Sequence, residues 1–257
     1  MLVTESLRLQ SALRASGFHL ICSLIIGLMA AALVFGLWYP HPYGDFAGGR
    51  DLFLLIISID IVCGPMLTAV VFDPKKPRSE LWRDLGFIFI IQLGALSYGL
   101  NILWHARPVY LVQEVDRFKV ITLPELEMTK VANLEEALRP RWNAGPMIIA
   151  IRDPKDARER QEVMFESVQG GRDYAERADF YIRYEGDAAA KSLKRAKNLR
   201  DFLKKFPQQE SAAKKIINLN DSNYDDFFYL PIVARRDWIA ILDNKGMIRG
   251  FLKGDGF

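Results

Sequence analysis

The residue with the most unusual chemical setting is Asp60, a carboxylate about nine residues into an apolar run of about 21 residues. A charge near the middle of a bilayer costs several kcal/mol unless it is paired, protonated or turned toward another helix. Gly64 and Thr68 follow at four-residue spacing, so the three residues share one face of a helix. Pro65 removes a helix hydrogen bond beside this face and should bend the helix. The spacing predicts one polar, small-residue face in an otherwise apolar helix.

Gln92 lies at a similar depth in the next apolar run. The two runs are joined by a short loop and should be antiparallel, so Asp60 could hydrogen-bond Gln92. Three readings are open for this pair. It could be a polar clamp that holds two helices together, a face that receives another transmembrane helix, or part of a path for protons or ions. The last is the weakest, because one isolated carboxylate makes a poor relay.

Catalytic signatures are absent from the sequence. The only histidines, His19, His41 and His105, lie at or near the ends of apolar runs, so none can activate a nucleophile in the body of the polar part. There is no Gly-x-Ser-x-Gly elbow, Walker loop, Gly-x-Gly-x-x-Gly or Cys-x-x-Cys. Both cysteines, Cys22 and Cys63, lie inside apolar runs, which argues against a disulfide framework or a zinc site. We therefore expect no catalytic residue, cofactor, metal or small-molecule substrate.

The charged residues are distributed unevenly. Of the 34 Lys and Arg and 31 Asp and Glu, only 14 precede His105. This distribution indicates lipid as the surroundings of the first part and water as those of the second. The formal net charge of +3 gives no reason to expect a nucleic-acid partner.

Three apolar runs precede His105, and each is long enough to cross a hydrocarbon core about 30 Å thick. The first is longer than the apolar part of a signal peptide and ends in Trp38-Tyr39-Pro40, which favours an uncleaved anchor. The expected spans are 17–39, 52–72 and 85–104. The expected domains are a cytoplasmic tail at 1–16, a three-helix membrane domain at 17–104 and a soluble domain at 105–257.

Positive charges near the spans predict the orientation. Six lie in the N-terminal tail and the second loop, whereas the first loop has only Arg50. Because Lys and Arg favour the cytoplasmic side, the N-terminus and the second loop should be cytoplasmic. Three crossings then place everything after Trp104 on the outer side of the membrane. In a Gram-negative cell, this side of the inner membrane is the periplasm.

The part after Pro108 should form a small mixed α/β or α+β domain. Alternation predicts a hairpin over 108–122, a buried strand over 146–151, and strands over 228–234, 238–242 and 247–252, the last after an Asn-Lys-Gly turn. Helical spacing predicts helices over 157–168, 174–184 and 188–206.

The last of these predicted helices would carry a basic face. Such faces are usually solvated, but this one could contact phospholipid headgroups or an acidic partner surface. Its members are Lys191, Lys194, Arg195, Lys197, Arg200, Lys204 and Lys205.

The order and spacing of several short motifs over 20–120 resemble the type IV pilin accessory proteins of the TfpX/TfpZ kind. The motifs are Tyr39-Pro40, Asp-Ile-Val-Cys-Gly-Pro-Met-Leu-Thr at 60–68, Phe72, Lys75-Lys76, Asp84, Gln-Leu-Gly-Ala-Leu-Ser-Tyr-Gly at 92–99, Arg107-Pro108-Val109-Tyr110 and Asp116-Arg117-Phe118.

The resemblance implies an inner-membrane accessory protein that acts with a cognate major pilin, contacting its membrane helix and its periplasmic head. It implies a chaperone-like role in pilus assembly or surface display, and no catalysis. The residues expected to contact the pilin helix are Asp60, Gly64, Pro65, Thr68, Gln92 and Tyr98. The remaining motif residues are Tyr39, Pro40, Asp84, Arg107, Pro108 and Tyr110. The alternative reading is a membrane-tethered periplasmic enzyme or ligand-sensing domain.

Overall fold

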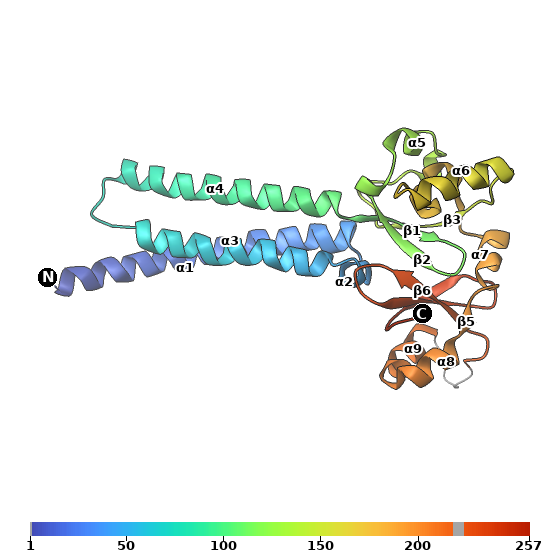
Figure 1. Cartoon of the computed structure of the whole chain (residues 1–257). Coiled ribbons are helices and arrows are strands. Elements are labelled where there is room, and N and C mark those ends of the chain that lie inside the picture. Colours follow the sequence, from blue (N-terminus) through green and yellow to red (C-terminus); the bar gives the residue numbers. More distant parts are fainter. Residues whose placement is uncertain (1, 218–223) are drawn as a thin grey trace. The chain divides into compact units, whose positions relative to one another are not determined.

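A computed structural model describes residues 2–217 and 224–257, with side chains from residue 8 onward (Figure 1). The chain divides into two compact units. The first comprises residues 1–37 and 49–105, and the second comprises residues 38–48 and 106–257. The loop at 38–48 was expected in the membrane domain, yet its contacts group it with the second unit.

The first unit consists of three long helices. Helix α1 (Leu2–Leu33) continues into a π-helical turn, η1 (Val34–Trp38), and is followed by α3 (Gly49–Val71) and α4 (Arg78–His105). In the described part of the chain, Arg8–Trp38, Gly49–Val71 and Arg78–His105 are each long and apolar enough to cross a membrane. The helices occupy the three predicted spans, and α4 begins earlier than expected.

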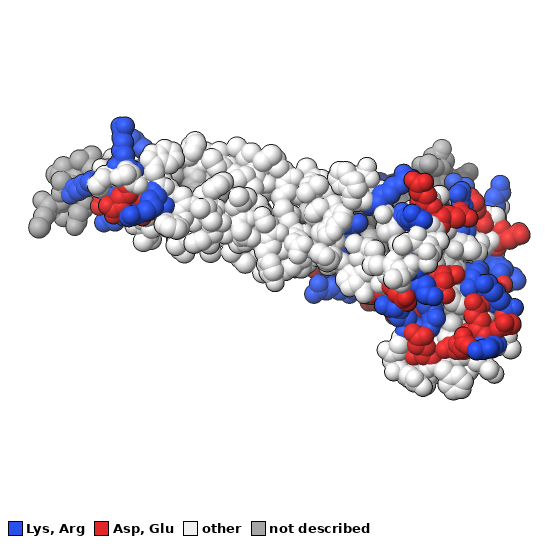
Figure 2. All heavy atoms as spheres, turned by 90° about the horizontal axis from the view of Figure 1, so that it is seen from above, with Lys and Arg blue, Asp and Glu red and all other residues white. Residues whose placement is uncertain are grey.

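The outer surface of these helices is apolar, as lipid requires. Side chains such as Leu28, Val70 and Ile90 are exposed, and Figure 2 shows little charge along the helices except at one end. Ion pairs join residues beside the connection between α3 and α4. Arg8 lies 3.7 Å from Asp73, and Lys76 lies 2.8 Å from Asp84.

Small residues allow the three helices to pack closely. A Cβ atom added to Gly27 on α1 would lie 3.0 Å from the Ile57 side chain on α3. One added to Gly99 on α4 would lie 2.5 Å from Ile56. This is the packing expected of membrane helices, where close backbone approach replaces hydrophobic burial as a source of stability.

The second unit is built on one mixed sheet. Its strand order is β4-β3-β1-β2-β6-β7-β8, with the short β5 also paired to β6. The pairs β1–β3 and β2–β6 are parallel, and the others are antiparallel. The strands are β1 (Pro108–Gln113), β2 (Phe118–Thr122), β3 (Met147–Ile151), β4 (Tyr181–Arg183), β5 (Lys197–Asn198), β6 (Phe228–Val233), β7 (Trp238–Leu242) and β8 (Ile248–Lys253).

Alternation along the strands sends side chains into cores on both faces of the sheet. On one face, Leu111 and Leu230 belong to a cluster that is covered by α7 (Gly186–Ser192) and α2 (Tyr43–Phe46). On the other face, Tyr110 packs in a second cluster with the segment around α5 (Met128–Ala132), while Ile241 packs in a third with α8 (Leu199–Lys205) and α9 (Glu210–Ile217). The domain thus has helices on both faces of a mixed sheet, as expected for an α/β or α+β fold.

Most of the predicted elements of this domain are confirmed. The hairpin is β1–β2, the buried strand is β3, and helix α6 (Ala157–Val168) has the predicted bounds. The three C-terminal strands are β6, β7 and β8, and Gly246 forms the turn before β8 with a φ of 80°.

Two predicted helices are wrong. Residues 174–184 form two 3₁₀ turns, Tyr174–Glu176 and Ala178–Phe180, followed by β4. Residues 188–206 do not form one helix, because α7 ends at Ser192 and β5 intervenes before α8. The predicted basic face is therefore divided. Lys191, Lys194 and Arg195 lie at the end of α7, whereas Lys204 and Lys205 lie at the end of α8.

Candidate functional site

Asp60, Gly64 and Gln92 are brought together between α3 and α4. The Gln92 Nε2 atom donates a hydrogen bond of 3.1 Å to the main-chain oxygen of Asp60. Gly64 makes this contact possible, because an added Cβ would lie 2.1 Å from Gln92 Nε2 and 2.7 Å from its Cδ. The predicted contact thus exists, with the main-chain oxygen of Asp60 as the acceptor of this bond, and the Asp60 carboxylate also interacts with the Gln92 side chain.

Pro65 and Thr68 continue the same polar face and meet α1 instead of α4. The Ser16 hydroxyl donates a hydrogen bond of 2.8 Å to the Pro65 carbonyl, and His19 Nδ1 lies 2.6 Å from Thr68 Oγ1. Thr68 is buried, with 2% of its surface exposed. The polar face of α3 therefore contacts both neighbouring helices, and Ser16 and His19 are members of it that the sequence patterns did not single out.

Tyr98 is not part of this group. It lies on α4 with 69% of its surface exposed. The structure therefore brings together five of the six residues expected to contact a pilin helix, and places the sixth on the outer surface of the three-helix unit.

Four motif residues are packed within the second unit. Tyr39 and Arg107 are both buried, and the two groups affect each other's pKa: burial lowers that of Arg107 to about 10, while the Tyr39 hydroxyl opposes the change. Pro40 packs against Gly145, where an added Cβ would lie 2.6 Å from its ring. Tyr110 donates a hydrogen bond of 2.6 Å to the Leu138 carbonyl, at the end of the 3₁₀ turn Glu136–Leu138.

The loop at 38–48 packs into the second unit, which the sequence patterns did not predict. Phe46 is fully buried, and its ring lies 5.7 Å from Trp238 and 5.8 Å from Phe251. The Tyr43 ring lies 5.8 Å from Phe251, and the Arg236 main-chain N–H donates to the Phe46 carbonyl at 3.2 Å. The sequence signal for burial of this loop was the presence of two aromatic residues, Tyr43 and Phe46, in so short a segment. Aromatic side chains favour packing in a core over exposure in a solvated loop.

The described residues contain no group of three or more His, Cys, Asp and Glu placed to hold a metal ion. Cys22 and Cys63 are free. The polar contacts between the three long helices can hold those helices together. The contacts of the loop at 38–48 can pack it into the core of the soluble domain.

Relatives of the chain are fimbrial assembly proteins of Dichelobacter nodosus. The chain is 34% identical over 249 residues to the serogroup I protein and 32% identical over 249 residues to the serogroup E1 protein, covering 96% of both chains in each case. It is also 40% identical over 111 residues to the protein of serogroups C1 and C2, a match that covers 43% of this chain and 85% of that relative. A family model described as fimbrial assembly protein FimB matches residues 7–48.

The chain belongs to the fimbrial assembly protein FimB family. The family model ends at Gly48, so it covers most of α1 together with the loop that carries Tyr43 and Phe46. No solved structure matches the chain.

Proposed function

We propose that this FimB-family protein is an inner-membrane accessory factor of the TfpX/TfpZ kind that assists the assembly or surface display of a type IV pilin. Likeness to fimbrial assembly proteins over 96% of the chain carries the proposal. The three helices support it, since they would place the protein where a pilin subunit waits before assembly.

The loop at 38–48 supports the proposed topology. It belongs to the same compact unit as residues 106–257, so the two must lie on one side of the membrane. Two crossings between the loop and the soluble domain, one by α3 and one by α4, meet this requirement. The positive charges of the second loop then assign that side to the periplasm.

Such a protein would contact a pilin at two places. Helices α3 and α4 would offer a surface to the pilin's membrane helix, with Tyr98 on it. Asp60, Gly64, Pro65, Thr68 and Gln92 would hold α1, α3 and α4 together and so shape a groove for the pilin helix on this surface. The soluble domain would meet the pilin head. Two linked contacts raise the effective concentration for the second contact once the first has formed.

The test is a clean in-frame deletion, with surface pili and total cellular pilin measured by immunoblot. We expect loss of surface pili that the gene restores in trans. The pilin level then separates protection of the subunit from a later assembly step. Normal pili and normal pilin in the deletion strain would overturn the proposed function.

The groove has its own test in Asp60→Ala. This variant removes the carboxylate and with it the interactions with Gln92 on α4 and His19 on α1, but keeps the main-chain oxygen that Gln92 binds. We expect fewer surface pili at an unchanged level of the accessory protein. Unchanged piliation would show that the carboxylate has no part in pilin binding.

A further inference from the structure

A pocket of about 700 Å³ lies at the carboxyl ends of the parallel strands β1 and β3. Its walls are the loops at 113–117 and 151–154, residues 173–174 and the end of α7. The carboxyl ends of adjacent parallel strands are where α/β proteins commonly bind ligands, because the connecting segments diverge there. We call it the β1–β3 pocket.

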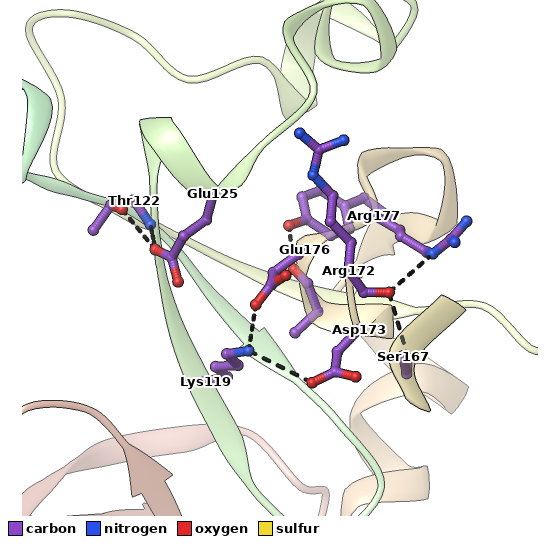
Figure 3. A network of polar contacts seen from close by, with 10 residues as sticks. Lys119, Thr122, Glu125, Ser167, Arg172, Asp173, Glu176 and Arg177 are labelled. Carbon is purple, nitrogen blue, oxygen red and sulfur yellow. Dashed lines mark hydrogen bonds and ion pairs between the residues drawn. The ribbon is translucent and has the colours of Figure 1, made fainter. Parts of the chain in front are cut away.

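The walls of the β1–β3 pocket are held by polar contacts. Figure 3 shows Lys119 on β2 reaching toward Glu176 and Asp173, at 2.6 and 4.0 Å. On the other side, the Arg152 guanidinium pairs with both oxygens of Glu159, at 2.8 and 2.9 Å, and stacks 4.1 Å over the Phe180 ring. A pocket with fixed walls loses little entropy when it is filled.

The charges of the rim are only partly balanced. Asp116 pairs with Arg117, and Asp153 pairs with Lys191 at 2.7 Å. Glu114 turns inward, where its carboxyl group accepts the Ala175 main-chain N–H and burial raises its pKa.

Two further cations of the rim lie near these paired carboxylates. Beyond the hydrogen bonds within the two ion pairs, the charge of Arg195 helps to lower the pKa of Asp116 and that of Lys194 helps to lower the pKa of Asp153. The exposed side chains of Lys194 and Arg195 form no hydrogen bond or ion pair with any described residue. The rim therefore offers positive charge beside two neutralised pairs.

Part of the remaining lining is apolar. Ile151, Pro154 and the Tyr174 ring contribute to it, and Val115 stands at the edge with 72% of its surface exposed. Among the described residues, the rim has only two cations beyond its ion pairs, and Asp116 and Asp153 lie beside them. A ligand with one or two carboxylates therefore fits the rim better than a polyanion such as nucleic acid or an anionic lipid surface. The chemistry that fits is a short segment with one or two carboxylates and an apolar side chain, which matches the volume of the pocket.

We propose that the β1–β3 pocket binds a short acidic segment of the pilin head, with its carboxylates at Lys194 and Arg195 and an apolar side chain against Ile151 and Tyr174. This inference rests on the proposed function and names the surface of the soluble domain that would carry it out.

The first experiment measures the affinity of the full-length protein in detergent for the soluble head of the cognate pilin by calorimetry. We expect the double variant Lys194→Glu/Arg195→Glu to bind on the order of tenfold or more weakly, because each reversal turns an attraction into a repulsion. Its matched control is Lys204→Glu/Lys205→Glu, which changes the net charge equally at the end of α8, away from the pocket. Equal binding by the two variants, or no binding by the wild type, would overturn the proposal that the β1–β3 pocket binds the pilin head.

The second experiment places a photo-crosslinking phenylalanine analogue at Val115, with Val168 as the control. Val168 is 82% exposed but lies at the end of α6, outside the pocket lining. We expect a crosslink to pilin, detected with anti-pilin antibody, from position 115 only.

Competition and the deletion strain separate the remaining outcomes. Displacement of the pilin head by an acidic peptide but not by inorganic phosphate supports the pocket, whereas equal displacement by phosphate identifies a small-anion site and overturns it. If the deletion strain loses its pili while Lys194→Glu/Arg195→Glu binds normally, the pocket inference fails and the accessory function stands. If the deletion strain keeps normal pili, the proposed function fails whatever the binding data show.

Discussion

Gly64 is the residue on which the packing of α3 against α4 depends most directly. We expect Gly64→Val to lower the free energy of unfolding of the protein in detergent by about 1–3 kcal/mol, the usual cost of overpacking. The reason is that the new side chain occupies the position of the Gln92 amide. Thermal unfolding followed by fluorescence measures the change.

The control for this substitution is Gly94→Val on α4, where an added Cβ meets nothing within 4 Å. A cycle with Gln92→Ala adds a second check. Gln92→Ala alone should cost about 0.6 kcal/mol, a typical value for a hydrogen bond between membrane helices. It should also relieve part of the Gly64→Val penalty. Strictly additive effects would show that the two residues do not share one space.

Residue types alone predicted which positions of this site lie close together, but not which atoms they contact. A carboxylate, a glycine and an amide at matching depth in adjacent spans indicated Asp60, Gly64 and Gln92 as a group. The sequence could not show that Gln92 binds the backbone, because every residue has a carbonyl. Nor did it single out Ser16 and His19, whose partners depend on the rotation of α1 about its own axis.

Among the elements, α6 is held by little apolar burial. Val163 is its only buried residue. Its first turn is instead fixed by Glu159, which pairs with Arg152 and accepts the Lys155 N–H at 2.5 Å, while Asp156 caps the Glu159 N–H.

These contacts lower the pKa of Glu159 from 4.5 to about 2, mainly through the hydrogen bonds from Arg152. A carboxyl group with a depressed pKa stabilises the fold above its unfolded value and loses that effect as the pH falls through its folded value. Glu159→Gln should therefore speed amide exchange in α6 at pH 7. The difference from the wild type should shrink below pH 4.5 and disappear near pH 2. Hydrogen exchange at matched pH values measures it.

Glu162→Gln is the control, because Glu162 pairs only with the exposed Arg158 on the same helix. Surface pairs of this kind contribute little. Faster exchange of α6 in this variant as well would mean that the helix, and not its first turn, is the sensitive part.

Strands whose side chains alternate between the two faces of the sheet were predictable. Segments whose apolar residues pack in two different core clusters were not. The strands β1, β2, β3, β6, β7 and β8 could be recognised because each feeds cores on both faces of one sheet. The predicted helix over 188–206 failed because its apolar residues serve two cores: Leu193 packs on one face of the sheet, and Leu199 and Phe202 on the other. Their spacing imitates a helix only by coincidence.

For the whole molecule, the loop at 38–48 is the feature that distinguishes this fold from a helical anchor with a separate soluble domain. We expect Phe46→Ala to lower the free energy of unfolding of the soluble domain by about 3–5 kcal/mol, the usual cost of truncating a buried phenylalanine. Phe165→Ala, at a position that is 62% exposed, should be nearly neutral. Limited proteolysis of the full-length protein compares the two variants.

The proposed topology predicts the accessibility of two positions in a variant whose Cys22 and Cys63 are replaced by alanine. A cysteine at His41, whose side chain is 84% exposed, should react with a membrane-impermeant maleimide in intact spheroplasts. A cysteine at the exposed Lys75 should react only after lysis. The opposite pattern would reverse the orientation, and labelling of both positions in intact cells would rule out an α3 that crosses the membrane.

The position of Phe46 in the sheet core also has a consequence for how the chain is made. Its partners Trp238 and Phe251 leave the ribosome roughly 10–40 s later at ordinary rates of synthesis. In the proposed topology, the Phe46 ring stays outside the membrane until then, and the core in which it packs has not yet formed. A chain whose second or third helix inserted the wrong way would deliver the sheet to the side opposite the loop, leaving one face of the sheet open. Exposed apolar surface of this kind marks a chain for degradation. In the proposed topology, completion of the soluble domain is therefore a check on correct membrane insertion.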